Sequence, residues 1–383
     1  SAASDVYKRQ VQTPEIKKLL FLFNTLFRDN FLFNGSIGMS KYSKGSYIDE
    51  HTDHGGYIYD NEKYYRNISA VIYFNKDWKQ HYGGSFMDIE NKNIVLETNL
   101  PIQNLINRGK VRDLYDMGDS LLIVSSDRIS AYDAVLPTGI LGKGEVLTKL
   151  SKFWFSLTEN IIQNHFITDN VTEAYPSLKE HEEILKGRSM IVKKAKPLAV
   201  ECIVRGYITG SGWSEYKKQG TVCGIKLKDG LLESEKLSPT IFTPSTKAEQ
   251  GEHDENIDFE TCVGIIGQEL AEKVRDYSIK IYSTAHDYAK SKGIIIADTK
   301  FEFGLVGDEL ILIDEVLTPD SSRFWPLGLY EEGRGQQSYD KQFVRDYLTS
   351  VGWDKNPPAP QLPEDIASLT SKKYIEAIDL LTA

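Results

Sequence analysis

Three charged residues alternate along one short stretch of the sequence, Asp298, Lys300 and Glu302. Residues two apart in a β-strand project from the same face, so a strand here would present two carboxylates and an ammonium group together. A lysine in this setting can meet the oxygens of a transferring phosphate, where its positive charge offsets developing negative charge. These three are therefore candidate catalytic residues. A solvated polar strand face with structural ion pairs would show the same three letters.

A candidate metal site depends on the pairing of this strand in a hairpin expected over residues 294–317. Pairing symmetric about Gly307 would place Lys300 opposite Asp314 and make Glu302 its diagonal neighbour. Diagonal carboxylates about 7–8 Å apart leave room for a cation, and Mg2+ prefers one or two carboxylates with phosphate oxygens and water. We predict Glu302 and Asp314 as Mg2+ ligands. A one-residue slip would send Asp314 to the opposite face.

Five further strings surround this hairpin, and none of them is a Walker loop, because GxxxxGK[ST] does not occur. They are RGKVRDLY (108–115), SDRISAYD (126–133), PLAVECIVRGYITGS (197–211), FTPSTKAEQGEHDEN (242–256) and DEVLTPDSSR (314–323). Together with the alternating triplet, and in this order, they resemble the phosphoribosylaminoimidazole-succinocarboxamide synthase (SAICAR synthetase) family of purine biosynthesis. The resemblance covers residues 95–383.

The resemblance implies an α+β, two-lobed SAICAR-synthase-like fold with an ATP cleft and a lobe boundary near residue 197. It also implies an ATP- and Mg2+-dependent ligase. Such an enzyme joins L-aspartate to the carboxylate of CAIR, a phosphorylated aminoimidazole nucleotide, and gives SAICAR, ADP and phosphate. The carboxylate is a poor acylating agent, so an acyl phosphate is the expected intermediate. The partners are then small molecules only, and the sequence sets no oligomeric state.

The same resemblance suggests roles for residues within the strings. The ATP-binding candidates are Gly109, Lys110, Val111, Arg112, Lys193 and Glu201. The substrate-binding candidates are Arg205, Ser211, Arg323, Asp320, Asp127, Ser130, Asp133 and Lys247. Arginine offers a planar fork for the nucleotide's phosphate, and an acidic co-substrate needs a cation, which favours Lys247. His253 is equally compatible with loop anchoring.

The segment before residue 95 carries a different pattern. His51 and Asp53 form an HxD pair that would place two metal ligands on one strand face. With the YFN…W…GG continuation, residues 11–94 resemble a truncated Fe(II)/2-oxoglutarate dioxygenase of the prolyl-hydroxylase type, a partial, β-rich, incomplete double-stranded β-helix. No second histidine follows at the required distance, so His51 and Asp53 are read as a vestigial iron pair, and Fe(II) and 2-oxoglutarate are not expected. Residues 1–10 are interpreted as a non-native, adapter-like scar.

Two alternatives accompany the ligase hypothesis. One is a bifunctional fusion that retains dioxygenase activity in the first segment. The other is a binding module in which residues 1–94 dock a partner and the ligase has decayed. Every charged residue that the ligation scheme requires is present, which argues against decay.

The composition fits this interpretation and sets the elements that must position the site. A length of 383 residues predicts two or three domains, and a net charge of −10 disfavours general nucleic-acid binding. Three scattered cysteines offer no disulfide framework, and no apolar run reaches membrane-spanning length, which favours the cytoplasm. Periodicity predicts helices over 14–33, 149–164, 262–292 and 364–381, and strands over 121–125, 189–193 and 198–204.

Overall fold

The computed structural model describes residues 57–59, 62–64, 93–101, 104–247 and 255–383. The chain forms two compact units, residues 1–76 and 77–383. In the first unit, β1 (Tyr57–Tyr59) and β2 (Glu62–Tyr64) form an antiparallel pair. The helix predicted over 14–33 and the pair His51 and Asp53 lie outside the described residues, so the dioxygenase-like interpretation stays a sequence prediction.

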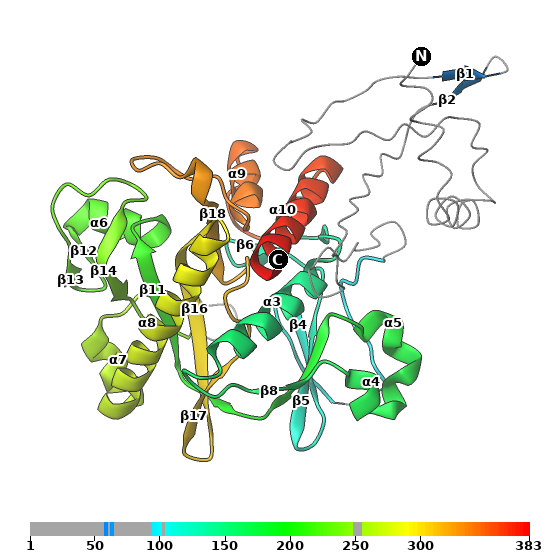
Figure 1. Ribbon diagram of the computed structural model, residues 1–383, viewed down its shortest axis with the longest axis horizontal. Helices are drawn as coiled ribbons and strands as arrows, with labels where there is room; N and C mark the ends of the chain where they lie inside the picture. Colours follow the sequence, from blue (N-terminus) through cyan, green and yellow to red (C-terminus); the bar gives the residue numbers. More distant parts are fainter. Residues whose placement is uncertain (1–56, 60–61, 65–92, 102–103, 248–254) are drawn as a thin grey trace, which may run out of the picture. The chain divides into compact units, whose positions relative to one another are not determined.

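The second unit begins with a five-stranded antiparallel sheet in the order β3-β4-β5-β9-β8. Its strands are β3 (Leu105–Arg108), β4 (Arg112–Asp116), β5 (Ser120–Ser125), β8 (Phe166–Thr168) and β9 (Ser189–Lys193). Alternation along β5 buries both faces: Leu122 and Val124 face one cluster and Ile123 the other. The cluster around Leu122 includes α4 (Val171–Ala174), η2 (Pro176–His181) and α5 (Glu182–Leu185), and that around Ile123 includes α3 (Lys143–Thr158) (Figure 1).

A second sheet of seven strands is built around the long strand β16 (Ile294–Val306). The other strands are β10 (Lys196–Pro197), β11 (Val200–Tyr207), β14 (Lys236–Phe242), β15 (Ser245–Thr246), β17 (Glu309–Ile313) and β18 (Ser322–Pro326). Every pairing between named strands is antiparallel, in agreement with the predicted α+β class. The sheets change between Lys193 and Lys196, next to the predicted boundary.

The helix α8 (Gln268–Ser291) covers one face of the second sheet (Figure 1). Its buried residues, among them Ala271, Val274, Ser278 and Ile281, recur every three or four positions, as an amphipathic helix requires. The prediction of one helix over 262–292 was wrong, because Gly267 (φ +86°) separates α7 (Phe259–Ile266) from α8. The helix predicted over 149–164 begins and ends six residues earlier, as α3.

The remaining elements are short except for the last helix, α10. They are β6 (Ser130–Ala131), β7 (Ala134–Val135), α6 (Gly210–Gln219), β12 (Thr221–Val222), β13 (Ile225–Lys226), η3 (Leu327–Leu329), α9 (Gln342–Ser350) and α10 (Glu364–Thr382). The helix α10, predicted over 364–381, packs against α3 and α9. One apolar core includes residues of both sheets, α3, α8 and α10, so the two lobes fold against each other.

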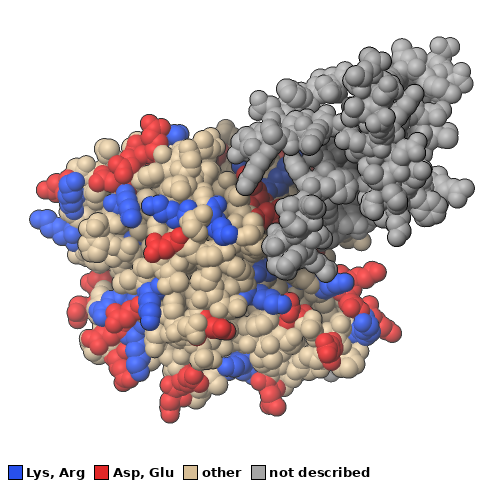
Figure 2. All heavy atoms as spheres, viewed as in Figure 1, with Lys and Arg blue, Asp and Glu red and all other residues tan. Residues whose placement is uncertain are grey.

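Among the described residues, no helix combines the length and the apolar character that crossing a membrane requires. Acidic and basic side chains are interspersed over the face drawn in Figure 2 rather than gathered by sign. The three cysteines, Cys202, Cys223 and Cys262, are buried and unbridged.

Candidate active site

The three alternating residues of β16 lie on one face of the second sheet, as the sequence predicts. Asp298 lies opposite Arg205 of β11, and Lys300 lies opposite Ile203. Directly opposed residues share a face of the sheet. Phe301, which stands between the charged positions, turns to the other face and joins the core under α8. The charged face is therefore the one turned away from α8.

Two ion pairs stand on this charged face. Lys300 Nζ lies 2.5 Å from Glu201 Oε1, and Glu302 forms an ion pair with Lys247. Burial opposes the charge of Lys300, but the carboxylates of Glu201 and Glu302 outweigh it and raise its pKa. Burial also opposes the charge of Glu302, whereas Lys247 and Lys300 lower its pKa. Both side chains therefore remain charged near neutral pH.

The pairing of β16 with β17 corrects the predicted register. Glu302 lies opposite Ile313, one residue away from pairing that is symmetric about Gly307. A two-residue turn joins the strands, and its first residue, Gly307, has φ +60°. The centre of the hairpin therefore falls after Gly307 and not on it. Lys300 is consequently not opposite Asp314.

Asp314 still reaches the charged side, because its backbone leaves the strand pattern directly after β17. Its φ of +64° lies in the left-handed region, which few residues other than glycine adopt. Arg112 of β4 donates one hydrogen bond to the Asp314 carboxylate, with Nη2 3.0 Å from Oδ2, and its Nη1 lies 2.5 Å from Oδ1 as an ion pair. This ion pair links the first sheet to the segment that follows β17.

The charge state of Asp314 follows from its crowded surroundings. Burial raises its pKa to about 6; Arg112 lowers it, while Glu302 and Glu315 raise it further. Burial opposes the charge of Arg112, yet Asp314 and Glu315 raise its pKa. The site thus gathers carboxylates that a nearby cation would stabilise.

Glu302 and Asp314 line a cavity of about 260 Å³ that residues of both sheets enclose. Its apolar wall is formed by Leu114, Leu121, Ile123, Val192, Ala195 and Pro197. Arg112, Lys193 and Lys247 add positive charge, and Gly109 also borders the cavity. An apolar wall beside a few convergent charged groups is typical of a small-molecule binding site. Three predicted ATP contacts, Gly109, Arg112 and Lys193, are therefore brought together.

A second cluster forms at the other end of the charged face. Arg205 Nη1 donates to Asp298 at 3.0 Å, and Arg205 Nη2 lies 3.2 Å from Ser211 Oγ. Arg323 also forms an ion pair with Asp298. Gly210 and Ser211 begin α6, and Gly210 lies directly beside the Arg323 guanidinium, so the unpaired amide groups of the first helical turn are close to this cluster. Two guanidinium groups, a hydroxyl and a helix N-terminus make a typical anion-binding site.

Other predicted contacts are placed differently. Lys110 forms an ion pair with Asp133, and both are about half exposed. Val111 is buried, and its carbonyl accepts bonds from the amide and the hydroxyl of Ser126. Glu201 binds Lys300 but does not line the cavity. Of these residues, Lys110 is the one whose ammonium group is open to a ligand.

Three of the candidate substrate-binding residues are buried. Asp127 is completely buried and accepts bonds from the amides of Val95 and Gly144 and from Arg188. Ser130 is buried in β6. Asp320 is 1% exposed. Because the Asp127 carboxylate oxygens already accept these hydrogen bonds, its placement favours a structural role over direct contact with a substrate.

Asp320 belongs to a buried network that the sequence did not reveal. Lys143 Nζ lies 2.6 Å from its Oδ2, and Tyr374 donates to its Oδ1 at 2.7 Å. Lys341 Nζ lies 3.4 Å away. Burial opposes the charge of Asp320, but Lys143 and Lys341 hold its pKa well below the usual range. The partners come from α3, α10 and the segment before α9, so no local spacing could have signalled them.

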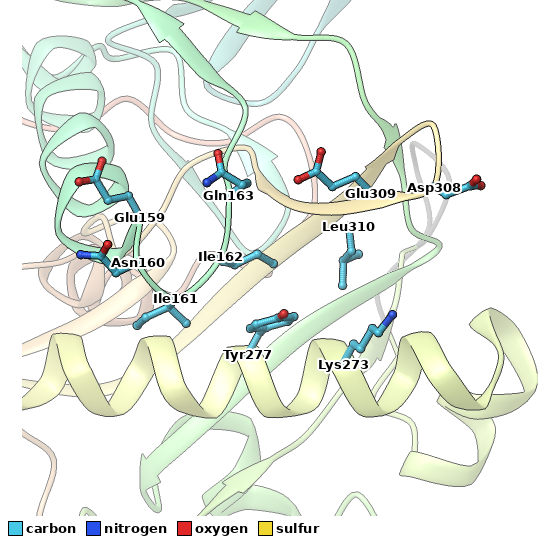
Figure 3. Close-up of a pocket in the computed structure, with 10 residues that line it drawn as sticks. All are labelled: Glu159, Asn160, Ile161, Ile162, Gln163, Lys273, Tyr277, Asp308, Glu309 and Leu310. Carbon is cyan, nitrogen blue, oxygen red and sulfur yellow. The ribbon is translucent and has the colours of Figure 1, made fainter.

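A larger cavity lies elsewhere and lacks this chemistry. It has a volume of about 450 Å³ and lies beside α8, at the tip of the hairpin of β16 and β17. In Figure 3, Leu310 and Ile161 point toward the helix that carries Tyr277 and Lys273. Lys273 is paired with Glu269. Lys300 and Glu302, the residues suited to phosphoryl transfer, do not line it.

Comparison with known proteins gives one consistent family. The sequence model described as SAICAR synthetase matches residues 105–360. The phosphoribosylaminoimidazole-succinocarboxamide synthase of Thermodesulfovibrio yellowstonii is 59% identical over 292 residues, which are 76% of this chain and 100% of that protein. The Geobacter sulfurreducens protein of the same name is 58% identical over 289 residues, 76% of this chain and 98% of the relative.

Solved structures give the same result. SAICAR synthase from Saccharomyces cerevisiae, complexed with SAICAR, has a TM-score of 0.69 at 46% identity. The match covers 75% of this chain and 98% of the yeast chain. A SAICAR synthetase in complex with ADP shares the fold, with a TM-score of 0.53 at 24% identity over 72% of this chain and 96% of the other.

Proposed function

The chain belongs to the SAICAR synthetase family and is an ATP-dependent ligase that joins L-aspartate to CAIR; from this premise we propose which residues hold each reactant. The observation that carries the proposal is the continuous charged face of β16. One end of that face lies in an apolar-walled cavity with Glu302, and the other lies in a cluster of two arginines at Asp298. A nucleoside triphosphate and a phosphorylated nucleotide would then approach each other along one strand, with Lys300 between them.

We assign ATP to the 260 Å³ cavity. Its apolar wall suits the base, while Arg112, Lys193 and Lys247 can meet phosphate oxygens. Gly109 permits close approach of a phosphate to the backbone, and Lys110 can leave its exposed partner Asp133 for a phosphate. An exposed ion pair of this kind contributes at most about 1 kcal/mol, so a triphosphate can replace it.

Glu302 and Asp314 fit Mg2+. No group of three or more His, Cys, Asp or Glu side chains able to hold a metal ion occurs in the described part of the chain. Two carboxylates are nevertheless the usual protein share of a Mg2+ site that phosphate oxygens and water complete. Bound there, Mg2+ would neutralise charge on the phosphates during transfer. The raised pKa of Asp314 shows that its negative charge is poorly compensated, and a bound cation would compensate it.

Binding of the metal implies an exchange of partners. Glu302 is held by Lys247, and Asp314 is held by Arg112. When Glu302 and Asp314 bind Mg2+, the side chains of Lys247 and Arg112 are released and can bind anions in the cavity. We propose that Lys247, which is one third exposed, then meets a carboxylate of L-aspartate. Arg112, which is more enclosed, then meets phosphate.

We assign the phosphate of CAIR to Arg205, Arg323 and Ser211. In the structure Asp298 compensates both guanidinium groups, so this carboxylate orients the arginines while their remaining N–H groups stay free to donate. The assignment leaves Asp320 as an anchor of the segment that carries Arg323. Asp127, Ser130 and Asp133 then shape the walls of the cleft.

The chemistry follows from these positions. A carboxylate oxygen of CAIR attacks the γ-phosphorus of ATP, and ADP leaves with the bond's electron pair. Lys300 offsets the charge that develops on the transferring phosphate. The amine of L-aspartate next attacks the acyl carbon and loses a proton. The carbon–oxygen bond to phosphate breaks, and the amide and inorganic phosphate result.

An isotope experiment tests this sequence of steps. CAIR labelled with 18O in its carboxylate is incubated with ATP, Mg2+ and L-aspartate, and the released phosphate is weighed by mass spectrometry. The acyl phosphate route predicts one 18O in each phosphate, because a carboxylate oxygen leaves with phosphorus. Phosphate without the label would rule the route out.

The first segment carries no part of this proposal. The resemblance of residues 11–94 to a dioxygenase rests on sequence alone, because His51 and Asp53 lie outside the described residues. Iron-dependent release of succinate from 2-oxoglutarate by the full chain would establish the bifunctional alternative.

A further inference from the structure

Arg128 reaches from the segment after β5 to the turn that joins β3 and β4. It is 7% exposed. Its Nη2 donates to the carbonyl of Gly109 at 2.9 Å, and its Nε donates to the carbonyl of Lys110 at 3.2 Å. Gly109 lines the cavity that we assign to ATP, and Arg128 does not. Arg128 therefore holds two successive peptide groups at the edge of that cavity from outside it.

These two hydrogen bonds fix the direction of the neighbouring amide groups. The C=O and N–H groups of a trans peptide unit point in opposite directions, and both peptide units are trans. With the carbonyls of Gly109 and Lys110 turned to Arg128, the amides of Lys110 and Val111 point away from it. Among the described residues, neither amide donates a hydrogen bond within the chain. Successive N–H groups of a turn form a concavity that binds anions.

The segment that carries Arg128 also holds the next carbonyl of the turn. Ser126 donates to the carbonyl of Val111 through its amide at 2.9 Å and its hydroxyl at 2.8 Å. The amide of Gly109 donates to the carbonyl of Arg112 at 2.8 Å, which closes the turn. Three successive carbonyl groups are therefore bound by residues 126 and 128. The strings RGKVRDLY and SDRISAYD thus form one structural unit.

Two contacts hold the guanidinium of Arg128 in place. Asp113 is completely buried, and its Oδ1 accepts from Arg128 Nη2 at 2.8 Å. Its Oδ2 accepts from the amide and the hydroxyl of Thr98 at 2.8 and 2.7 Å. Arg128 Nη1 donates to the carbonyl of Leu96. Asp113 thus compensates the buried charge. The planar fork of arginine reaches all of these acceptors at once, which a lysine ammonium group cannot do.

We propose that Arg128 is a positioning residue that keeps the carbonyls of Gly109 and Lys110 turned inward and so presents the amides of Lys110 and Val111 to the phosphates of ATP. This inference rests on the proposed assignment of ATP to the cavity beside this turn. It assigns Arg128 no contact with any reactant. A turn that lost this support would also direct carbonyl oxygens at the phosphates, which they repel.

Arg188 offers a matched control in the same lobe. It is 4% exposed. Its Nη1 donates to the buried carboxylate of Asp127 at 3.0 Å and to the carbonyl of Ser125 at 3.3 Å. Within the described part of the chain, it forms no hydrogen bond with residues 109–111. Replacing either arginine by lysine keeps a positive charge beside a buried aspartate and removes the planar fork.

The test measures the dissociation constants of ATP with Mg2+, and of CAIR, for the full chain by isothermal titration calorimetry. We expect Arg128→Lys to weaken ATP binding about 10-fold or more, which corresponds to one lost hydrogen bond to a charged group. CAIR binding should not change, because the turn contacts only ATP. Arg188→Lys should bind both ligands as the unaltered chain does. Thermal unfolding shows that each variant is folded at the assay temperature.

Three results would overturn the inference: unchanged ATP binding by Arg128→Lys, an equal loss of ATP binding in Arg188→Lys, or equal losses of ATP and CAIR binding in Arg128→Lys. The last is what a merely structural role predicts. If Arg128→Lys does not fold, the double variant Arg128→Met with Asp113→Asn leaves no buried charge unpaired. Compared with Arg188→Met with Asp127→Asn, it decides the question in the same way.

Lys110→Met distinguishes failure of this inference from failure of the proposed ATP site. It removes an exposed ammonium group from the same turn and should weaken ATP binding by itself. A loss in Lys110→Met without a loss in Arg128→Lys would overturn the role of Arg128 alone. Unchanged ATP binding by Lys110→Met would show that ATP does not bind at this turn, and the inference would fall with that assignment.

Discussion

Gly210→Ala tests the anion cluster at the start of α6 most sharply. Gly210 has φ +56°, and a Cβ atom built there would lie 2.2 Å from Arg323 Nη2 and 2.7 Å from its Cζ. Ordinary contact begins at 3.4 Å, so the guanidinium must retreat by about 1.2 Å. A shift of that size exceeds the tolerance of a hydrogen bond to phosphate.

The expected loss follows from the contact that breaks. A hydrogen bond to a charged group contributes roughly 1.5–3 kcal/mol, which corresponds to about a 10- to 150-fold fall in kcat/KM for CAIR. The left-handed backbone adds about 1–2 kcal/mol of destabilisation. Steady-state assays should therefore show a higher KM for CAIR with the KM for ATP unchanged, and thermal unfolding should show a modest decrease in Tm.

Gly220→Ala supplies the control at the opposite end of the same helix. Gly220 has φ +71°, and within the described residues no atom lies within 4 Å of an added Cβ. It carries the backbone cost without the clash. If Gly210→Ala loses no more CAIR affinity than Gly220→Ala, the placement of the CAIR phosphate at Arg323 is refuted.

Three further substitutions test the metal site, the buried network of Asp320 and the pH dependence of stability. Glu302→Gln should lower kcat/KM about 100-fold or more, because a metal ligand is lost, while Tm changes little. Glu309→Gln at the hairpin tip should have no effect. A Glu302→Gln variant as active as the unaltered chain, at low and at saturating Mg2+ alike, would show that the metal is misplaced. Lys143→Met should lower the free energy of unfolding, measured in urea, by about 3 kcal/mol, because Asp320 remains buried with one cation fewer. Lys149→Met on the exposed side of α3 should change it by less than about 1 kcal/mol. Similar losses in both variants would contradict the stabilising role of the Asp320 network. Burial lowers the pKa of His286, so the unfolded chain binds the proton more readily and the free energy of unfolding falls as pH drops below about 6.5. His286→Gln should reduce the slope of unfolding free energy against pH by up to about 1.4 kcal/mol per pH unit. An unchanged slope would show that His286 is charged in the folded chain.

Local patterns predicted the parts of this molecule that local physics decides. The alternation of Asp298, Lys300 and Glu302 placed them on one face, and the strand register with β11 agrees with that prediction. The order of the strings also predicted the family. The last helix, expected over 364–381, is α10.

Features that depend on one backbone angle or on distant partners could not be predicted in the same way. The register of the hairpin depends on whether Gly307 is the central residue of the turn or the first of two turn residues. The position of Asp314 turned on a left-handed residue that no spacing reveals. Gly267 divides a continuous helical pattern in two. Asp320 was predicted to contact the substrate because it stands close to Arg323 in the sequence. In the structure its buried carboxylate binds Lys143, nearly 180 residues earlier.

We propose that phosphoryl transfer and amide formation in residues 95–383 take place along one charged face. Release of ADP by the full chain, measured with CAIR, L-aspartate and Mg2+–ATP, tests it most directly. We expect ADP release that requires both CAIR and L-aspartate, with one SAICAR formed for each ADP. No ADP release, or ADP release that proceeds equally without CAIR and without L-aspartate, would contradict it.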